Sequence, residues 1–377
     1  MGVLSRFFLN RRYIYANSVF LNSLGVLIYK AQMTLSGQVQ NKNKPAPATA
    51  SPLGPMEELS LLLKSDLMKV NEIILGKMVS EIPLIPQLAG HLIAAGGKRI
   101  RPMLTLASAA LCGYKGDRQH RLAACVEFIH TATLLHDDVV DDSGQRRGRP
   151  SANAVFGNEA AVLVGDFLFS RSFQLMVEDG SLDVLRILSN ASAIIAEGEV
   201  LQLSTASNLE TTEEQYLRVI HSKTAELFAA ACEVGAVVAG RPAAECGALR
   251  DYGTNLGIAF QISDDVLDYA ASETKLGKTV GDDFREGKMT LPVIRALKEA
   301  TPEEAAFWQR CVANLDQRPE DLKKAQEMLK GRGALKSSLA DARRYAEAAC
   351  KALTIFPDSP VRQYLMDLAA FSAERDY

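Results

Sequence analysis

The sequence predicts an all-α protein, a large helical bundle around a central cavity. Apolar residues recur at positions i, i+3 and i+4 with polar residues between them, which is the period of an amphipathic helix. No stretch shows the alternation that is typical of a strand. Segment 224–240 is apolar on most faces, so a helix there must be buried on several sides. The expected helices span 57–79, 119–142, 158–177, 181–204, 211–240 and 243–270.

Two helix starts carry capping signals, and one segment breaks the helical pattern. Thr211 and Glu214 have the spacing of a capping box. Thr301 and Glu304 have it too, with a proline at the first helical position between them. Segment 271–288 places three glycines among charged residues, and loops of that length are often lids over a functional site.

Residues 1–56 differ in composition from the rest of the 377-residue chain. They contain Lys and Arg, no Asp or Glu, and scattered apolar residues, which is the composition of a mitochondrial transit peptide. The apolar stretch Ile14–Tyr29 is interrupted by Asn and Ser and is too short and polar for a membrane span. A proline-rich, stiff linker follows. We therefore expect a transit peptide and linker at 1–56, a single all-α domain at 57–377, and a location in the mitochondrial matrix; a disordered basic tail is the alternative.

Charge and cysteine usage exclude some classes of protein. Lys plus Arg is 42 and Asp plus Glu is 45, so the chain lacks the basic excess of a nucleic-acid-binding surface. The six cysteines form no CxxC pair, and most lie in apolar, helix-like contexts. That usage indicates reduced, buried thiols and a reducing compartment.

The stretch LHDDVVDDSGQRRGRP concentrates acidic and then basic residues. Asp137 and Asp141 are four residues apart and so share one face of a helix, with Asp138 beside them. Carboxylates without a helix-spaced His or Cys partner suit a hard, oxygen-seeking ion such as Mg²⁺. Arg146 and Arg147 follow, and planar guanidinium groups suit phosphate. The pattern indicates a metal-bridged phosphoester; a solvated acidic helix end with a basic turn is the alternative.

A second acidic triplet, Asp264, Asp265 and Asp268, repeats the same spacing in FQISDDVLDY. These acids lie in an otherwise apolar run, where a buried carboxylate must be paired or bound to metal. Two such triplets in a helical protein can face each other across a cavity, and we expect that arrangement here.

The stretch GGKRIRP is a candidate phosphate site that needs no metal. Lys98, Arg99 and Arg101 supply positive charge, and two glycines let the backbone approach a ligand. No GxxxxGK[ST] frame fits, so this is not a Walker loop. An exposed basic turn at a helix N-terminus is the alternative.

In this order, GGKRIRP, DDVVDD…RRGRP and FQISDDVLD resemble the trans-type polyprenyl diphosphate synthases, as do HSKTAELF and the GK…GDD…GK loop. The resemblance runs from about residue 57 to the C-terminus. It is strongest to the mitochondrial long-chain enzymes, of the solanesyl and decaprenyl type, that make the side chain of ubiquinone. It implies an isoprenoid synthase-like fold and a Mg²⁺-dependent prenyltransferase. In that reaction an allylic diphosphate ionises, isopentenyl diphosphate attacks the carbocation, and the chain grows by five carbons.

The resemblance also implies roles for the residues that match these motifs. Mg²⁺ would be held directly by Asp137, Asp141 and Asp264, with Asp138, Asp265 and Asp268 acting through water. The allylic diphosphate would be held by Arg146, Lys223 and Lys278, and isopentenyl diphosphate by Lys98, Arg101, His130 and Arg147. Thr224 and Gln261 would line the path of the carbocation, and Lys288 would help to close the loop.

Residues just before the first acidic cluster bear on product length. In the family the product grows along a tunnel there, and Ala132 and Thr133 occupy positions where short-chain members have bulky aromatic residues. Thr133 lies one helical turn before Asp137, roughly 6 Å along the axis at about 1.5 Å per residue. Phe128 lies on the opposite face of that helix. We therefore predict a long all-trans product.

Three other functions share parts of the pattern. A class I terpene cyclase has paired acidic sites but needs no isopentenyl diphosphate site, so GGKRIRP argues against it. A non-catalytic subunit would be expected to lose acids from one cluster, and both clusters are whole. A metal phosphohydrolase built on His136–Asp137 would need further histidines at ligand spacing. The resemblance allows a homodimer or a heteromer with a related subunit, and peripheral membrane association for release of the product.

Overall fold

The fold is a helical bundle, as the sequence predicts. A computed structural model describes residues 54–94, 97–146, 148–270 and 280–374. The first half contains α2 (Pro55–Leu62), α3 (Lys64–Lys77), α4 (Leu84–Ala94), α5 (Ile100–Leu111), α6 (Arg118–Val140), α7 (Ala152–Phe156), α8 (Asn158–Asp179) and α9 (Leu182–Thr205). The second contains α10 (Glu213–Ile220), α11 (Glu226–Val238), α12 (Ala243–Ala270), α14 (Asp282–Arg285), α15 (Leu291–Lys298), α16 (Pro302–Trp308), α17 (Asp321–Gly331), α18 (Ala334–Ala352) and α19 (Pro360–Ala373).

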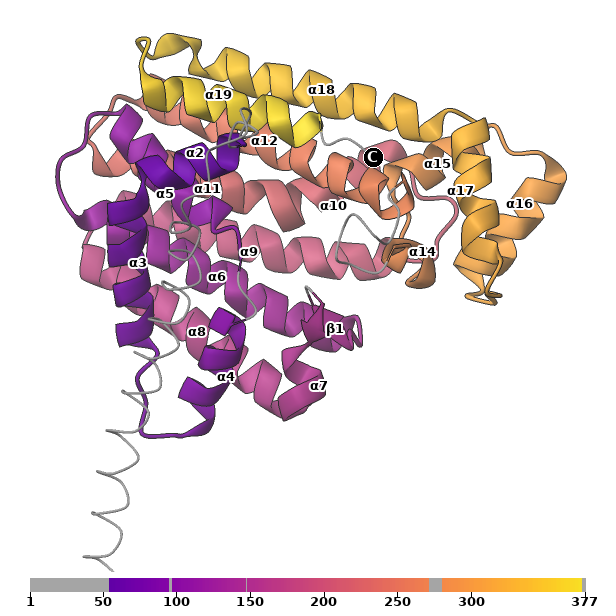
Figure 1. Cartoon of the computed structure of the whole chain (residues 1–377), viewed down its shortest axis with the longest axis horizontal. Coiled ribbons are helices and arrows are strands. Elements are labelled where there is room, and N and C mark those ends of the chain that lie inside the picture. The colour runs from indigo at the N-terminus through magenta and orange to yellow at the C-terminus, as the bar shows by residue number, and fades with distance from the viewer. Residues whose placement is uncertain (1–53, 95–96, 147, 271–279, 375–377) are drawn as a thin grey trace, which may run out of the picture. The chain divides into compact units, whose positions relative to one another are not determined.

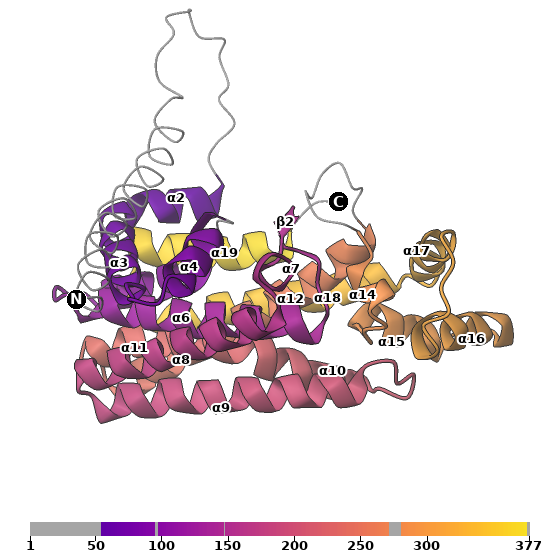
Figure 2. The same cartoon turned by 90° about the horizontal axis from the view of Figure 1, so that it is seen from below.

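Helices α11 and α12 form the centre of the bundle. α11 contacts α5, α9 and α12, and α18 runs along the opposite side of α12 (Figure 1). Seen from below, α9 lies at one surface of the bundle and α19 toward the other, with α12 between them (Figure 2). Every residue of α11 except Glu233 and Val237 is buried, which confirms that segment 224–240 is enclosed on several sides.

The contact between α11 and α12 depends on a glycine. A Cβ atom placed on Gly253 of α12 would lie 2.5 Å from the carbonyl oxygen of Phe228 and 2.7 Å from the Cα of Ala229, both in the backbone of α11. Because backbone cannot move aside as a flexible side chain can, only glycine permits this approach. The two central helices therefore pack almost backbone to backbone.

Several element boundaries differ from the sequence prediction. The expected helix 57–79 is two helices, because Leu63 interrupts it between α2 and α3. The predicted capping box at Thr211 and Glu214 is wrong. The N-cap of α10 is Thr212, whose side chain bonds the backbone of Gln215 while the Gln215 side chain bonds back. The box at Thr301, at the start of α16, is confirmed.

Two further differences fall near the motifs. The expected helix 211–240 contains one π-helical turn, His221–Ala225, between α10 and α11. The stretch after the first acidic cluster contains a two-residue antiparallel pair, β1 (Gln145–Arg146) with β2 (Arg149–Pro150). Of the loop expected at 271–288, residues 271–279 lie outside the described residues, and α14 forms within the remainder.

The cysteines agree with a reduced state. All six are free; Cys125, Cys232 and Cys311 are buried and the other three are partly buried. Burial raises the pKa of the Cys232 thiol to about 12, so this group stays protonated and unreactive at neutral pH.

We expect Gly253→Ala to lower the free energy of unfolding by about 1–3 kcal/mol, because the added methyl group overpacks the α11–α12 contact. Gly247→Ala is the matched control, since Gly247 lies in the same helix with no atom within 4 Å of its added Cβ. That substitution should raise stability by about 0.5–1 kcal/mol through helix propensity. Urea unfolding followed by circular dichroism measures both; equal effects of the two substitutions would contradict the packing argument.

Candidate active site

The first acidic cluster lies at the C-terminal end of α6, and Asp141 is the C-cap residue. Asp137 and Asp141 each face a lysine from a distant part of the chain. The Asp137 Oδ2 atom is 3.6 Å from Lys223 Nζ, and the Asp141 Oδ2 atom is 3.4 Å from Lys288 Nζ. Burial raises the pKa of Asp137, and the nearby Asp141 raises it further, while Lys223 opposes the shift. The two lysines therefore offset the repulsion between two carboxylates that share one face of the helix.

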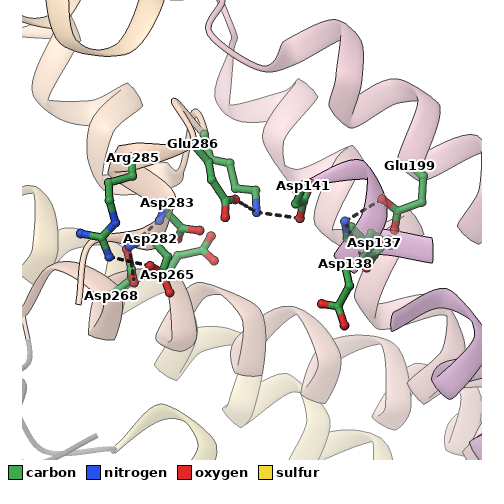
Figure 3. A network of polar contacts seen from close by, with 12 residues as sticks. Asp137, Asp138, Asp141, Glu199, Asp265, Asp268, Asp282, Asp283, Arg285 and Glu286 are labelled. Atoms are coloured by element: carbon green, nitrogen blue, oxygen red, sulfur yellow. Dashed lines mark hydrogen bonds and ion pairs between the residues drawn. The ribbon is translucent and has the colours of Figure 1, made fainter. Parts of the chain in front are cut away.

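Asp138 has a different environment from its two neighbours. Its side chain is 2% exposed and projects away from Glu199 and Asp141 (Figure 3). Its Oδ1 atom accepts a 2.7 Å hydrogen bond from Arg146 Nε, and its backbone oxygen accepts one from Asn153. In this arrangement Asp138 orients the Arg146 guanidinium.

Lys223 lies in the π-turn and contacts two carboxylates from different helices. Its ammonium is 2.6 Å from Glu199 Oε2 of α9, closer than it is to Asp137. Sequence reasoning missed Glu199, because nothing in the helical pattern separates it from the exposed Glu197 two residues earlier. Only the fold places Glu199 beside the motif residues.

The second acidic cluster lies near the end of α12 and is held by specific donors. Tyr216 Oη donates to Asp265 Oδ2 at 2.6 Å, and Gln261 Nε2 donates to Asp265 Oδ1 at 2.7 Å. Thr224 Oγ1 donates to Gln261 Oε1 at 2.8 Å, which joins the π-turn to this cluster. Despite these donors, burial raises the pKa of Asp265 to about 7. Asp264 is partly buried on the same helix.

Asp268 ties the segment after residue 280 to α12. Its carboxylate accepts backbone hydrogen bonds from Gly281 and Asp282 at 3.2 Å and from Asp283 at 3.0 Å. Burial raises the pKa of Asp268 to about 6. Burial and the neighbouring Asp265 and Asp268 also raise the pKa of Asp283 well above its usual range. Carboxylates therefore crowd this end of the cavity.

The two clusters face each other (Figure 3), and Lys288 reaches from the segment after α14 toward the first of them. Its backbone N–H donates to the Asp283 carbonyl at 2.9 Å, while its ammonium reaches Asp141 of the first cluster. Burial lowers the pKa of Lys288, but Asp283 and Asp141 raise it more, so the group is charged. A cavity next to the second cluster is lined by residues that include Gln202, Lys223, Thr224, Gln261, Asp265, Asp283 and Lys288.

A separate group of cations lies at the start of α5. Arg101 Nη1 is 3.1 Å from His130 Nε2, which must accept this bond because guanidinium is only a donor. The Arg101 guanidinium also stacks 4.6 Å from the centre of the Phe228 ring. His130 lies on α6 seven residues before Asp137, about two turns away on the same face. Lys98 is exposed just before α5.

The remaining predicted residues are not part of these contacts. Arg147 and Lys278 lie outside the described residues. Ala132 is fully buried, and the Thr133 hydroxyl donates to the His130 carbonyl oxygen at 2.8 Å. Neither residue lines the cavity beside Lys223 and Lys288. Their role in product length stays a prediction.

The donor chemistry of the cavity fits a hard divalent cation. The described residues contain no group of three acidic, His or Cys side chains already drawn together around one point. The carboxylates instead stand in two groups, with lysines between them and with Asp265 and Asp283 raised in pKa by burial and by acidic neighbours. Oxygen donors crowded in this way suit Mg²⁺ or a similar ion together with an anionic ligand.

The fold is a helical bundle, and its site combines facing acidic clusters with lysines and a separate basic group. This combination suits strongly anionic ligands that bind together with divalent cations. The chain belongs to the polyprenyl synthetase family, whose family model matches residues 82–329. It is similar to the octaprenyl diphosphate synthase of Escherichia coli, with 46% identity over 85% of this chain and 99% of the relative.

Two solved structures extend the comparison. The decaprenyl diphosphate synthase from Rhodobacter capsulatus has a TM-score of 0.82 and 54% identity, over 85% of this chain and 99% of its own. The polyprenyl synthase from Caulobacter crescentus, solved with calcium and isoprenyl diphosphate, has a TM-score of 0.83 and 51% identity, over 86% and 99%. These relatives identify the chain as a prenyltransferase, a polyprenyl diphosphate synthase of the long-chain type.

We expect Tyr216→Phe to lower the free energy of unfolding by about 1–3 kcal/mol, because the buried Asp265 loses a hydrogen-bond donor. In a double-mutant cycle with Asp265→Ala, the two losses should not add, since both substitutions remove the same contact. Denaturant unfolding of the four proteins gives the coupling energy. Strictly additive losses would show that the contact does not stabilise the site.

Proposed function

We propose that this long-chain synthase adds isopentenyl diphosphate repeatedly to an allylic diphosphate in a Mg²⁺-dependent reaction, and that the product supplies the side chain of ubiquinone. One observation carries the proposal: the two acidic clusters face each other (Figure 3), and Lys223 and Lys288 meet the first of them at Asp137 and Asp141. The Caulobacter relative was solved with calcium, which is also a hard, oxygen-binding cation, and with isoprenyl diphosphate.

The residues of the cavity have separate tasks in this proposal. Mg²⁺ held by Asp137, Asp141 and Asp264 would neutralise the charge that develops on the departing diphosphate. Arg146 and Lys223 bind the same diphosphate from the sides, and Asp138 orients Arg146. The Thr224 hydroxyl and the Gln261 amide, linked to each other, present dipoles to the cavity in which the carbocation forms. The released diphosphate would take the proton that is lost.

Isopentenyl diphosphate binds in the proposal to the second cation group, formed by Lys98, Arg101 and His130, with Arg147 as a further contributor. A guanidinium and an imidazole stand together there, apart from the two acidic clusters. Cations alone neutralise this diphosphate, so no metal is needed at this position. A terpene cyclase has no use for such a group, and a non-catalytic subunit has no use for two complete acidic clusters.

Purified chain, supplied with labelled isopentenyl diphosphate, an allylic primer and Mg²⁺, should form a long prenyl diphosphate. Activity should vanish in excess EDTA and return with Mg²⁺. Asp137→Ala should lower kcat by at least 10²-fold, as when charge stabilisation of a developing anion is removed. Full activity in EDTA would sink the metal-dependent mechanism, and a cyclic hydrocarbon product would establish the cyclase instead.

Ala132→Phe should shorten the product without abolishing condensation. Ala132 is fully buried on α6, so a ring at this position must project into the space along the helix. Thin-layer or mass-spectrometric analysis of the products measures the change. Val140→Phe is the control, because Val140 is 61% exposed on the same helix and should leave product length alone. An unchanged product from Ala132→Phe would contradict the tunnel argument.

Self-association fits the exposed apolar residues of α8 and α9. By length and composition alone α8 could cross a membrane. However, it packs along α6, and 44% of its most apolar stretch is buried in the bundle. We therefore propose that this surface contacts a second copy of the chain or a related subunit, and that the enzyme meets the membrane only peripherally to release product. The exposed apolar residues are Val162, Leu163, Phe173, Val177, Leu182, Val200 and Leu203.

We further propose that residues 1–56 direct the chain to the mitochondrial matrix. The octaprenyl synthase relative covers 85% of this chain and 99% of its own length, which leaves unaligned a share about as large as residues 1–56. A fluorescent protein fused after residues 1–50 should enter mitochondria, and a chain that starts at Pro55 should remain active. A cytosolic fusion would refute the targeting, and an inactive, unfolded truncation would refute the dispensability.

A further inference from the structure

We propose that Glu199 is a positioning residue that holds the Lys223 ammonium away from Asp137 and so keeps that carboxylate available to a metal ion. This inference rests on the proposed metal-dependent function, but it concerns a residue outside every motif that pointed to that function. Glu199 acts through Lys223 and does not itself bind the ion.

The geometry separates a near and a far partner of Lys223. Its Nζ atom is 2.6 Å from Glu199 Oε2, a charge-assisted hydrogen bond, and 3.6 Å from Asp137 Oδ2, which is an ion pair without a good hydrogen bond. The three residues come from α9, the π-turn and α6. Figure 3 shows Glu199 and Asp137 approaching the same point from different helices.

A close approach between the α9 backbone and the π-turn brings Glu199 to this position. A Cβ atom on the preceding residue, Gly198, would lie 2.6 Å from the Ser222 Cβ and 3.0 Å from the backbone nitrogen of Lys223. α9 therefore meets the π-turn directly at the residue pair that carries the two charges. A side chain at 198 would force α9 and the π-turn to shift relative to each other.

Burial makes the choice of partner matter. The side chains of Lys223, Glu199 and Asp137 are 21%, 28% and 15% exposed, so water screens their charges only in part. With Glu199 neutral, Asp137 becomes the single anionic partner within 4 Å among the described contacts of Lys223. The ammonium then moves onto Asp137, and a cation must displace it before binding there.

The test measures Mg²⁺ affinity rather than turnover. Isothermal titration calorimetry of the full chain with Mg²⁺, in the presence of inorganic diphosphate, compares wild type with Glu199→Gln. We expect affinity to fall about 10-fold, the lower end of the loss seen when residues that support metal ligands are changed. Glu197→Gln, on the exposed side of the same helix, should leave affinity unchanged.

A second background separates indirect from direct action. In chains that carry Lys223→Met, the further change Glu199→Gln should alter Mg²⁺ affinity less than about twofold, because the ammonium that it controls is gone. An undiminished 10-fold loss in that background would show that Glu199 is itself a ligand and would overturn the proposal. Unchanged affinity in both backgrounds would overturn it as well.

The outcome for wild type tests the proposed function separately. If wild-type chain binds no Mg²⁺ with diphosphate, the metal-dependent function fails, and this inference fails with it. If wild type binds Mg²⁺ and Glu199→Gln binds it equally well, only the role of Glu199 is lost. Thermal unfolding of each variant confirms that the change in affinity does not come from loss of the fold.

Discussion

The structure depends on keeping crowded carboxylates stable inside a helical bundle. α6 and α12 carry acidic clusters that face each other (Figure 3), and burial raises the pKa of Asp137, Asp265 and Asp268. Like charges this close repel, and poor solvation strengthens the repulsion. Cations and hydrogen-bond donors from other parts of the chain offset this repulsion, chiefly Lys223 and Lys288. Crowded carboxylates with lysines beside them are the setting in which the proposed metal ion and diphosphate would relieve the repulsion.

The π-turn is the local feature that makes this possible. A regular helix through 221–225 would rotate Lys223 and Thr224 relative to the cavity, because one extra residue per turn shifts every later side chain around the axis. With the π-turn, Lys223 reaches Asp137 and Glu199 while Thr224 reaches Gln261. Gly198 allows α9 to pack against this turn. A small irregularity of backbone thus links both acidic clusters.

In the proposed function, two basic groups bind two different diphosphates. Lys223 and Lys288 stand among carboxylates, so a ligand bound by them would share its site with a metal ion. Arg101 hydrogen-bonds the His130 imidazole and stacks on Phe228, so a diphosphate proposed to bind there would meet a guanidinium and an imidazole. α6 carries His130 and Asp137 two turns apart and so sets the spacing between the two sites. One rigid helix can in this way hold two anionic substrates in a fixed relation for reaction.

The sequence by itself determined the fold class and the family, and it singled out the two acidic triplets. Helical periodicity and enclosed apolar segments predicted the bundle, and the i, i+4 spacing of Asp137 and Asp141 predicted a shared helix face. These features are local, because they depend only on the 3.6-residue turn and on which side chains avoid water. Only the tertiary structure decided which carboxylates meet which cations. Three contacts show this: Arg146 donates to Asp138, the backbone of residues 281–283 donates to Asp268, and Glu199 pairs with Lys223. The spacing of these partners along the chain follows no helical period, so the sequence pattern does not predict the contacts. Helix boundaries at Leu63 and Thr212 and the π-turn likewise depend on packing between helices, which propensity along a single chain does not encode.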